Sequence, residues 1–333
     1  MKCIEGGVCA AKGFKATGLN AGIKNNVKKD MALVFSEAPC VKAGTFTTNR
    51  VCAAPVKWDR KVVFESESAQ AIVVNSGIAN ACTGDEGYEK CRLMAEQTAA
   101  ELGISEDAVL VASTGVIGKQ LPMDIIGKGI KMLPGKLGAT AADAALAAEA
   151  IMTTDTKSKQ VAVEVEIDGV PVHIGGMCKG SGMIHPNMAT MLYFITSDAL
   201  IDEKLLQKMV RAIVDDTFNM ISVDGDTSTN DSVLLIANGM AGNKKIEDEN
   251  SAGYEEFYDA LFYILCELSK KIAGDGEGAT CLFEVQMKNV KTKADAKVLA
   301  KSVITSNLTK AAIYGHDANW GRILCAMGYS GVD

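Results

Sequence analysis

The segment that most constrains the fold is QVAVEVEIDGVPVHIGG, residues 160–176. Three β-branched residues alternate with two glutamates over residues 163–167, and Asp168-Gly169 follows directly. Alternation with a period of two places one set of side chains on a single face of a strand. An Asp-Gly pair favours a two-residue hairpin turn. The segment therefore predicts an antiparallel hairpin with one buried face.

Helical and strand-like segments alternate along the rest of the chain. We expect helices where apolar residues recur at helical spacing, and strands where short apolar runs are bounded by Gly, Pro or Asn. The predicted helices are Tyr88–Leu102, Leu137–Met152, Glu203–Phe218 and Tyr254–Ile272. The predicted strands lie within residues 31–56, 69–77, 107–118, 232–239 and 281–290. This alternation predicts an α/β protein with layered sheets.

The composition argues against several classes of protein. A chain of 333 residues, 48% of them hydrophobic, can bury a sizeable core in one large or two ordinary domains. The net charge of −7 and the absence of a Lys/Arg run argue against a nucleic-acid partner. The apolar run Tyr258–Leu268 is too short to span a bilayer, and the N-terminus has no apolar stretch typical of a secretion signal. We therefore expect a cytoplasmic protein without nucleic-acid or membrane partners.

No motif for a metal or an organic cofactor stands out. The ten cysteines form no C-x-x-C pair and only three histidines are present, so we expect no metal and interpret the cysteines as small buried side chains in a reduced protein. GDGEGAT lacks the Gly-Lys-Ser/Thr of a phosphate-binding loop. VDGDTSTND begins like a calcium loop but has Thr229 at the sixth position and Leu235 at the twelfth. We interpret it as a turn held by side-chain hydrogen bonds.

The segment KGSGMIHPNMATML, residues 179–192, contains a candidate nucleophile of a different kind. No Ser-His-Asp arrangement is recognisable in the sequence, and G-x-S-x-G is absent. A threonine can act without such partners if the peptide bond before it is cut, because its own α-amine, with a pKa of about 7.7–8.0, can serve as the base. From the residues alone, the better interpretation of Thr190 is an ordinary threonine in a strand, and the nucleophile is the alternative.

The same segment closely resembles the self-cleavage segment of the ornithine acetyltransferase family, also called glutamate N-acetyltransferase or ArgJ. Further blocks resemble the family in the same order: AGTFTTNRVCAAPV, NSGIANACTG, VASTGVIG, MTTDT, VDGDTSTNDSVLLIANG, AGDGEGATCLFEV and DANWGRI. The resemblance implies a layered α-β-β-α sandwich with mixed sheets (DmpA/ArgJ-like).

The resemblance also implies that the chain cuts itself between Ala189 and Thr190. Residues 1–189 would form an α chain that contains the oxyanion hole, and residues 190–333 a β chain that begins with the nucleophile. The family pattern further implies an assembly of two α and two β chains, and no metal or organic cofactor.

Individual site residues follow from the matched blocks. Thr114 and Gly115 match the pair implicated in the oxyanion hole, where a hydroxyl and a backbone N–H stabilise a tetrahedral intermediate. The matched substrate-binding residues are Thr153 (Thr154 if the register differs by one), Lys179, Thr190 and Glu277. A lysine and a glutamate suit substrates that carry both a carboxylate and an ammonium group.

The implied reaction is ping-pong acetyl transfer in arginine biosynthesis, with small-molecule substrates. N2-acetylornithine would give its acetyl group to Thr190, and glutamate would accept it from the threonine ester. Whether acetyl-CoA also serves as a donor, as in bifunctional members, stays open. Two features depart from the family pattern: Ile78 stands where a polar residue is usual, and the resemblance implies that the C-terminal tail with further substrate contacts is lacking beyond Asp333.

Two other interpretations stay open. The chain could be an aminopeptidase of related fold that also uses an N-terminal nucleophile, or an inactive truncated homologue that keeps the fold as a scaffold. Acetyl transfer distinguishes the first from our interpretation, and cleavage with acyl-threonine formation distinguishes the second.

Overall fold

The computed structural model describes residues 1–24, 27–185 and 191–333. Its strands are β1 (Lys2–Ile4), β2 (Phe14–Leu19), β3 (Met31–Phe46), β4 (Ala69–Ile78), β5 (Val109–Val116), β6 (Lys159–Ile167), β7 (Val170–Lys179), β8 (Leu192–Ser197) and β9 (Ser232–Ala237). Its α-helices are α1 (Ala54–Glu65), α2 (Gly84–Leu102), α3 (Met123–Met132), α4 (Ala141–Ala150), α5 (Glu203–Asp216), α6 (Tyr254–Ala273), α7 (Lys293–Thr305), α8 (Asn307–Tyr314) and α9 (Trp320–Gly328).

Strand β3 belongs to two sheets and joins them. Its first part, from Met31, pairs with β2 and β4, and β5 continues that sheet. Its second part, Val41–Phe46, pairs with β9, and β8, β7, β6 and β1 continue the other sheet. The change of sheet coincides with an irregular register between Phe35 and Cys40. The pairs β4–β5 and β8–β9 are parallel and the other pairs are antiparallel, so both sheets are mixed.

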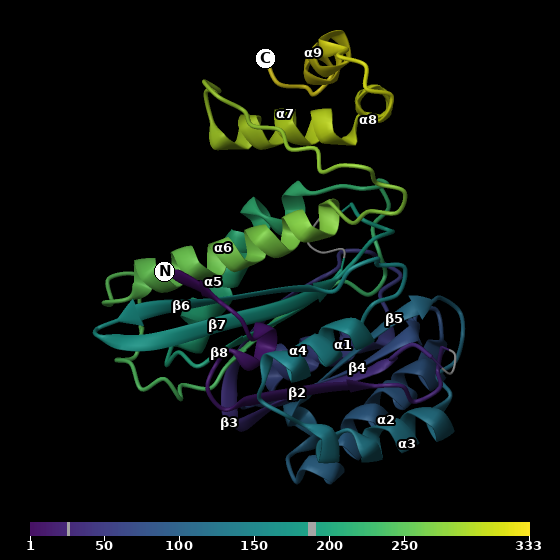
Figure 1. Ribbon diagram of the computed structural model, residues 1–333, viewed down its shortest axis with the longest axis vertical. Helices are drawn as coiled ribbons and strands as arrows, with labels where there is room; N and C mark the ends of the chain where they lie inside the picture. Colours follow the sequence, from purple (N-terminus) through teal and green to yellow (C-terminus); the bar gives the residue numbers. More distant parts are fainter. Residues whose placement is uncertain (25–26, 186–190) are drawn as a thin grey trace.

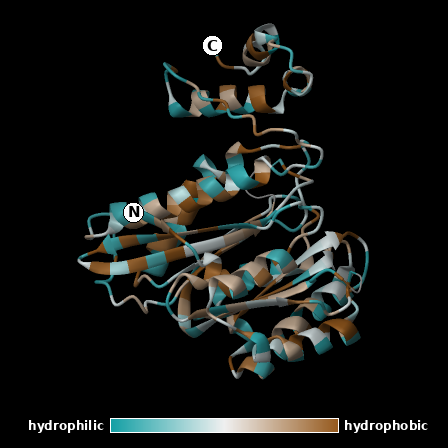
Figure 2. Ribbon diagram, viewed as in Figure 1, coloured by the Kyte–Doolittle hydropathy of each residue, from teal (hydrophilic) through white to brown (hydrophobic). Residues whose placement is uncertain are grey.

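The predicted hairpin is confirmed. Strands β6 and β7 pair in register up to Ile167 and Val170, so Asp168-Gly169 forms the turn. Val163, Val165 and Ile167 are buried, in a cluster with residues of α6. Figure 2 shows apolar and polar residues alternating along the hairpin. The period of two in the sequence thus fixes which face of this sheet carries helices.

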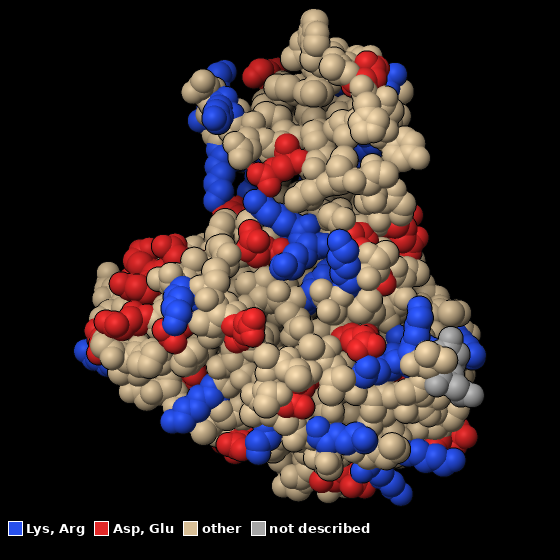
Figure 3. Space-filling view, viewed as in Figure 1, with Lys and Arg blue, Asp and Glu red and all other residues tan. Residues whose placement is uncertain are grey.

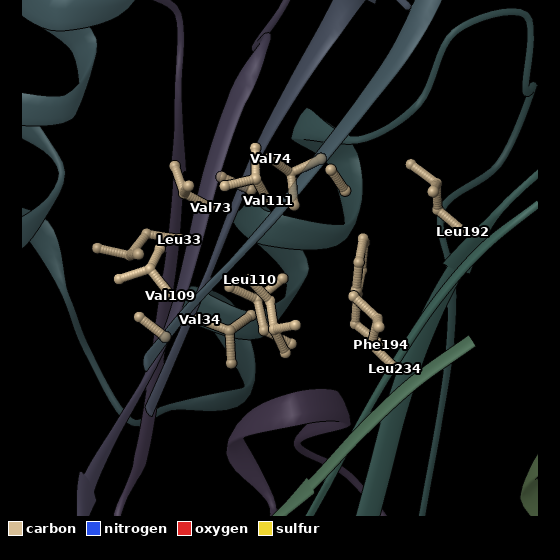
Figure 4. Packing of buried hydrophobic residues seen from close by; sticks show 14 of the residues in the cluster. Leu33, Val34, Val73, Val74, Val109, Leu110, Val111, Leu192, Phe194 and Leu234 are labelled. Atoms are coloured by element: carbon tan, nitrogen blue, oxygen red, sulfur yellow. The ribbon is translucent and has the colours of Figure 1, made fainter. Parts of the chain in front are cut away.

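Helices α2, α3, α5 and α6 cover the outer faces of the two sheets, α1 and α4 lie between the sheets in the view of Figure 1, and residues of both sheets share one buried core. In Figure 1, α5 and α6 lie beyond β6–β8, and α2 and α3 lie on the far side of the other sheet. Figure 4 shows Phe194 and Leu234 of one sheet near Leu110 and Val34 of the other, all members of one buried cluster. Each such side chain contributes about 1.5–3 kcal/mol when it leaves water. The layered α/β fold with mixed sheets is therefore confirmed.

The four predicted helices are confirmed as α2, α4, α5 and α6, with ends that differ by a few residues. Two strand predictions are wrong. Residues 54–56 begin helix α1, where Pro55 lies in the first turn and needs no donor there. Residues 281–290 have no strand structure, are mostly exposed and pair with no strand in the part of the chain that the structure describes.

The C-terminal helices α7–α9 lie beyond α6, away from the two sheets (Figure 1). Lys293 pairs with Asp216, and Lys297 pairs with Asp215 at 2.5 Å, which ties α7 to the end of α5. Figure 3 shows lysine and arginine side chains gathered where these helices meet the rest of the molecule, with acidic side chains beside them. A groove of about 510 Å³ runs between α6 and helices α7 and α8, and Glu277 lies on its wall.

Candidate active site

The predicted nucleophile and cleavage site lie outside the described residues. Ala189 and Thr190 fall between His185 and Met191, the nearest residues that the structure describes on either side. The residues on both sides of that segment define the surroundings of the site.

Hydrogen bonds fix the chain before and after the segment. The backbone N–H groups of Met183 and Ile184 donate to the Asp224 carboxylate at 2.6 and 2.8 Å. After the segment, the N–H of Ser232 donates to the carbonyl of Met191 at 2.8 Å. Asp224 also accepts an N–H from its own loop, which confirms that VDGDTSTND is a turn held by side-chain hydrogen bonds.

Thr114 and Gly115 lie near the end of β5, beside the end of β4. The ladder is irregular there, because Ile78 pairs with both Thr114 and Val116. Gly115 has a φ of +130°, and a Cβ at this position would lie 2.3 Å from the carbonyl carbon of Gly77. Only glycine fits such a close approach of two backbones. Ile78, where a polar residue was expected, is buried at this irregularity.

Lys179, the last residue of β7, is buried and reaches across to β5. Its Nζ donates a hydrogen bond to the hydroxyl oxygen of Thr114 at 3.2 Å. Burial lowers the pKa of Lys179, and the carboxylates of Asp155, Asp231 and Glu277 act in the opposite direction. The structure thus brings together two of the residues singled out from the sequence, one from each sheet.

A small cavity of about 30 Å³ lies beside this hydrogen bond. It is lined by Thr114, Lys179, Gly180, Gly182, Met183, Met191, Leu192, Ser228, Asn230 and Asp231. Asn230 fixes one wall, because its Nδ2 donates to the carbonyls of Ala79 and Ser113 at 2.6 and 2.8 Å. Two backbone segments around β4 and β5 are therefore tied to the loop that leads into β9.

Thr153 and Glu277 lie outside the lining of this cavity, as far as the described residues define it. Thr153 follows α4 and is half-buried, whereas Thr154 is exposed. Glu277 is exposed, and its N–H donates to the carbonyl of Ser181 at 2.9 Å. Its carboxylate lies against Gly182, where an added Cβ would be 2.5 Å from Oε1. Glu277 therefore neighbours the loop that follows Lys179.

Sequence reasoning missed a buried group of charges beneath the site. Lys159 lies between two carboxylates, with Nζ 2.6 Å from Asp155 Oδ1 and 2.6 Å from Asp275 Oδ2. Burial acts to raise the pKa of Asp155, but the ammonium groups of Lys179 and Lys159 bring it below its usual value. The acidic residues stand in MTTDT and GDGEGAT, but lone charges in loops are most often solvated, so the sequence carries no signal of their burial.

Lys24 was also missed. Its Nζ donates to the carbonyl of Met152, next to Thr153, at 2.5 Å and to the carbonyl of Lys29 at 3.0 Å. Burial lowers the pKa of Lys24 to about 8, partly offset by Asp30. It is a second ammonium group at the Thr153 side of the site.

Metal sites, reactive cysteines and membrane-spanning helices are the other features to consider in the described part of the chain. Within it, no group of three or more His, Cys, Asp and Glu side chains could hold a metal ion. The cysteines are free thiols, but the prediction that they are buried is wrong for most of them: four are exposed, two are half-buried and four are buried. Burial raises the pKa of Cys9 and of Cys40 to about 12, which makes these two poor nucleophiles at neutral pH. None of the described helices is both long enough and apolar enough to cross a membrane.

The fold and the site define a class: layered α/β proteins with mixed sheets, in which a glycine turn and a buried lysine flank the start of an inner strand. Within this class the chain belongs to the ArgJ family, whose family model matches residues 15–333. It is 57% identical over 320 residues to "Arginine biosynthesis bifunctional protein ArgJ 1" of Clostridium acetobutylicum, which is 96% of this chain and 78% of the relative. A relative of the same kind from Symbiobacterium thermophilum is 54% identical over 334 residues, 100% of this chain and 82% of its own length.

Two solved structures are similar to part of the chain. The arginine biosynthesis bifunctional protein of Bacillus halodurans matches with a TM-score of 0.54 and 44% identity, over 56% of this chain and 98% of the solved chain. The ornithine acetyltransferase of Mycobacterium tuberculosis, solved in complex with ornithine, matches with a TM-score of 0.52 and 41% identity, over 56% of this chain and 96% of the solved chain.

Proposed function

We propose that the chain is an N-acetyltransferase of arginine biosynthesis that moves the acetyl group of N2-acetylornithine to glutamate through Thr190. Membership of the ArgJ family supports the reaction class. The observation that carries the proposal is the hydrogen bond from Lys179 to Thr114 beside a cavity lined by Met191, the residue that follows Thr190 in the chain.

Self-cleavage would create the catalytic threonine. The Thr190 hydroxyl attacks the carbonyl of Ala189, the amide nitrogen leaves as the α-amine, and water hydrolyses the resulting ester. The coverage of the solved structures supports this step, since nearly the whole of each solved chain matches only 56% of the present one. Residues 1–189 would be 57% of the chain (189 of 333).

Thr114 and Gly115 would bind the oxyanion that forms at each acyl-transfer step. Because Lys179 donates to the Thr114 oxygen, the hydroxyl proton of Thr114 can be donated to a third group. The irregular, glycine-specific turn gives the N–H of Gly115 a fixed direction. Preorganised donors of this kind stabilise the developing charge without reorganisation during the reaction.

Lys179, Thr153 and Glu277 would bind the amino-acid substrates. The Lys179 ammonium suits a carboxylate, and the Glu277 carboxylate suits the ammonium group of ornithine or glutamate. We further propose a cytoplasmic assembly of two α and two β chains, without a metal or organic cofactor. A second activity with acetyl-CoA as donor is proposed from the relatives' description as bifunctional.

The test combines acetyl transfer with an intact-mass measurement. We expect the protein to convert N2-acetylornithine and glutamate into ornithine and N-acetylglutamate, and to separate on a denaturing gel into residues 1–189 and 190–333. Thr190→Ala should give a single band and no transfer. Peptide hydrolysis without acetyl transfer would instead identify an aminopeptidase, and uncut wild-type protein without acyl-threonine would identify a scaffold.

A further inference from the structure

We propose that Asp155, Lys159 and Asp275 form one positioning unit, which holds the proposed substrate-binding residues in place and joins the two chains made by self-cleavage. This inference rests on the proposed function, since it concerns the same site. None of the three residues is assigned to the chemistry itself.

Lys159 is the centre of the unit. It is the first residue of β6, and its ammonium is 2.6 Å from a carboxylate oxygen of Asp155 and of Asp275. The three side chains are only 2, 0 and 9% exposed, in the order Lys159, Asp155, Asp275. Charges so far from water are strongly destabilising without their partners. The three groups therefore hold one another at fixed positions.

Asp155 holds the backbone of one proposed binding residue and of the neighbour of another. It accepts the N–H of Thr153 at 3.0 Å and the N–H of Gly180, directly after Lys179, at 2.7 Å. Its charge also opposes the effect of burial on the pKa of Lys179. One carboxylate thus sets the distance between the segments that contain Thr153 and Lys179.

Asp275 connects the third proposed binding residue to the same unit. Its carboxylate accepts hydrogen bonds from the hydroxyl and, at 3.1 Å, the N–H of Thr156. Its backbone carbonyl accepts the Ser181 hydroxyl at 2.7 Å, and Glu277 donates its N–H back to Ser181 at 2.9 Å. The Glu277 loop is therefore tied both to MTTDT and to the loop after Lys179.

The unit also crosses the proposed cleavage site. Asp155 and Lys159 precede Ala189 in the sequence, whereas Asp275 follows Thr190. After cleavage the Lys159–Asp275 pair becomes a contact between two chains, so the alignment of substrate-binding residues from both chains depends on it.

A matched control exists elsewhere in the fold. Lys42 is also 2% exposed, and it pairs with Glu203 at 2.9 Å to join β3 to α5. Lys42→Met should therefore also lower thermal stability, although by less because Glu203 is 38% exposed, and it has no contact with Thr153, Lys179 or Glu277.

The experiment measures steady-state acetyl transfer from N2-acetylornithine to glutamate by Asp275→Asn, Lys159→Met, Lys159→Arg and Lys42→Met, with the melting temperature of each. We expect Asp275→Asn and Lys159→Met to raise both KM values about tenfold or more, since misplaced substrate contacts weaken binding steeply. We expect a smaller change in kcat, partial recovery in Lys159→Arg and unchanged KM in Lys42→Met. An unchanged KM in Asp275→Asn, or an equal rise in Lys42→Met, would overturn the positioning unit.

Two further measurements keep the test decisive. If Asp275→Asn does not fold, Thr156→Val removes a single exposed donor to Asp275 and should still raise KM, and an unchanged KM there would count against the unit. If the wild type performs no acetyl transfer, the proposed function fails, and hydrogen exchange then tests the unit separately. Lys159→Met should accelerate exchange at residues 153–155 and 179–182 where Lys42→Met does not, and equal exchange in the two variants would refute the unit.

Discussion

The ammonium of Lys179, at the end of one sheet, donates a hydrogen bond to the hydroxyl of Thr114, at the end of the other, at a distance of 3.2 Å. The two strands that carry them, β7 and β5, are far apart in the strand order and meet only because β3 joins the two sheets. The fold thus brings this pair to a cavity that Met191, the residue after the proposed nucleophile in the sequence, also lines.

The first prediction concerns the Thr114 hydroxyl. Thr114→Val keeps the shape of the side chain but removes the proton that would stabilise the oxyanion, so kcat should fall about 100-fold, with little change in KM. Thr114→Ser keeps the hydroxyl and should retain most of the activity. Single-turnover acetylation of the enzyme, followed by mass spectrometry, measures this step directly. Equal rates for the Val and Ser variants would rule out the role in the oxyanion hole.

The second prediction compares two glycines with positive φ. Gly115→Ala forces a Cβ to within 2.3 Å of the Gly77 backbone, whereas a Cβ at Gly118 (φ +79°) would meet nothing within 4 Å. A left-handed alanine costs about 1–3 kcal/mol in itself. Gly118→Ala should therefore lose only that amount in urea unfolding, and Gly115→Ala clearly more. Similar losses in the two variants would show that the close approach to Gly77 relaxes easily.

Some of these features could be predicted from the sequence, and others could not. Local patterns are sufficient for the hairpin at Asp168-Gly169 and for helices such as α6, because period and turn chemistry act over a few residues. The choice of Thr114, Gly115 and Lys179 as site residues depended on the family resemblance, because a contact such as that of Lys179 with Thr114 results from the pairing of distant strands.

Two features could not be predicted from local patterns in the sequence. The burial of Lys159 between Asp155 and Asp275 is set by three separate segments, and no local pattern marks a buried ion pair. The strand predicted at residues 281–290 failed for a different reason. These residues have strand propensity, but they pair with no described strand, and propensity alone does not form a sheet.

The third prediction is a pH profile of kcat/KM. The α-amine of Thr190 must be neutral to act as a base, so activity should rise through its pKa of about 7.7–8.0. Activity should fall again when the Lys179 ammonium deprotonates, and burial moves that loss below the pH of an ordinary lysine, about 10.4. In a Lys179→Arg variant that retains activity, the alkaline fall should disappear, because arginine stays charged.

Lys24 needs a control in the same experiment, because burial also lowers its pKa, to about 8, below that of an ordinary lysine. Lys24→Met should keep the alkaline fall if Lys179 causes it. A profile that loses this fall in Lys24→Met and keeps it in Lys179→Arg would assign the titration to Lys24 instead.

The last prediction concerns stability. Asp59 is fully buried on α1; its Oδ1 accepts the N–H of Val111 at 2.8 Å, and its Oδ2 has no hydrogen-bond partner among the described residues. Burial raises the pKa of Asp59 well above its usual value. An acid with a raised pKa in the folded state stabilises the fold fully below its unfolded pKa, about 3.9, and that contribution is lost as the pH rises toward the folded pKa.

Asp59→Asn removes this titration, because the amide is neutral at every pH and its oxygen can still accept from Val111. The variant should gain stability relative to the wild type as the pH rises from about 4 toward neutrality. Urea unfolding of the two proteins at a series of pH values measures the difference. If the gap between Asp59→Asn and the wild type stays constant over this range, Asp59 keeps the same protonation in the folded and unfolded states, contrary to its burial.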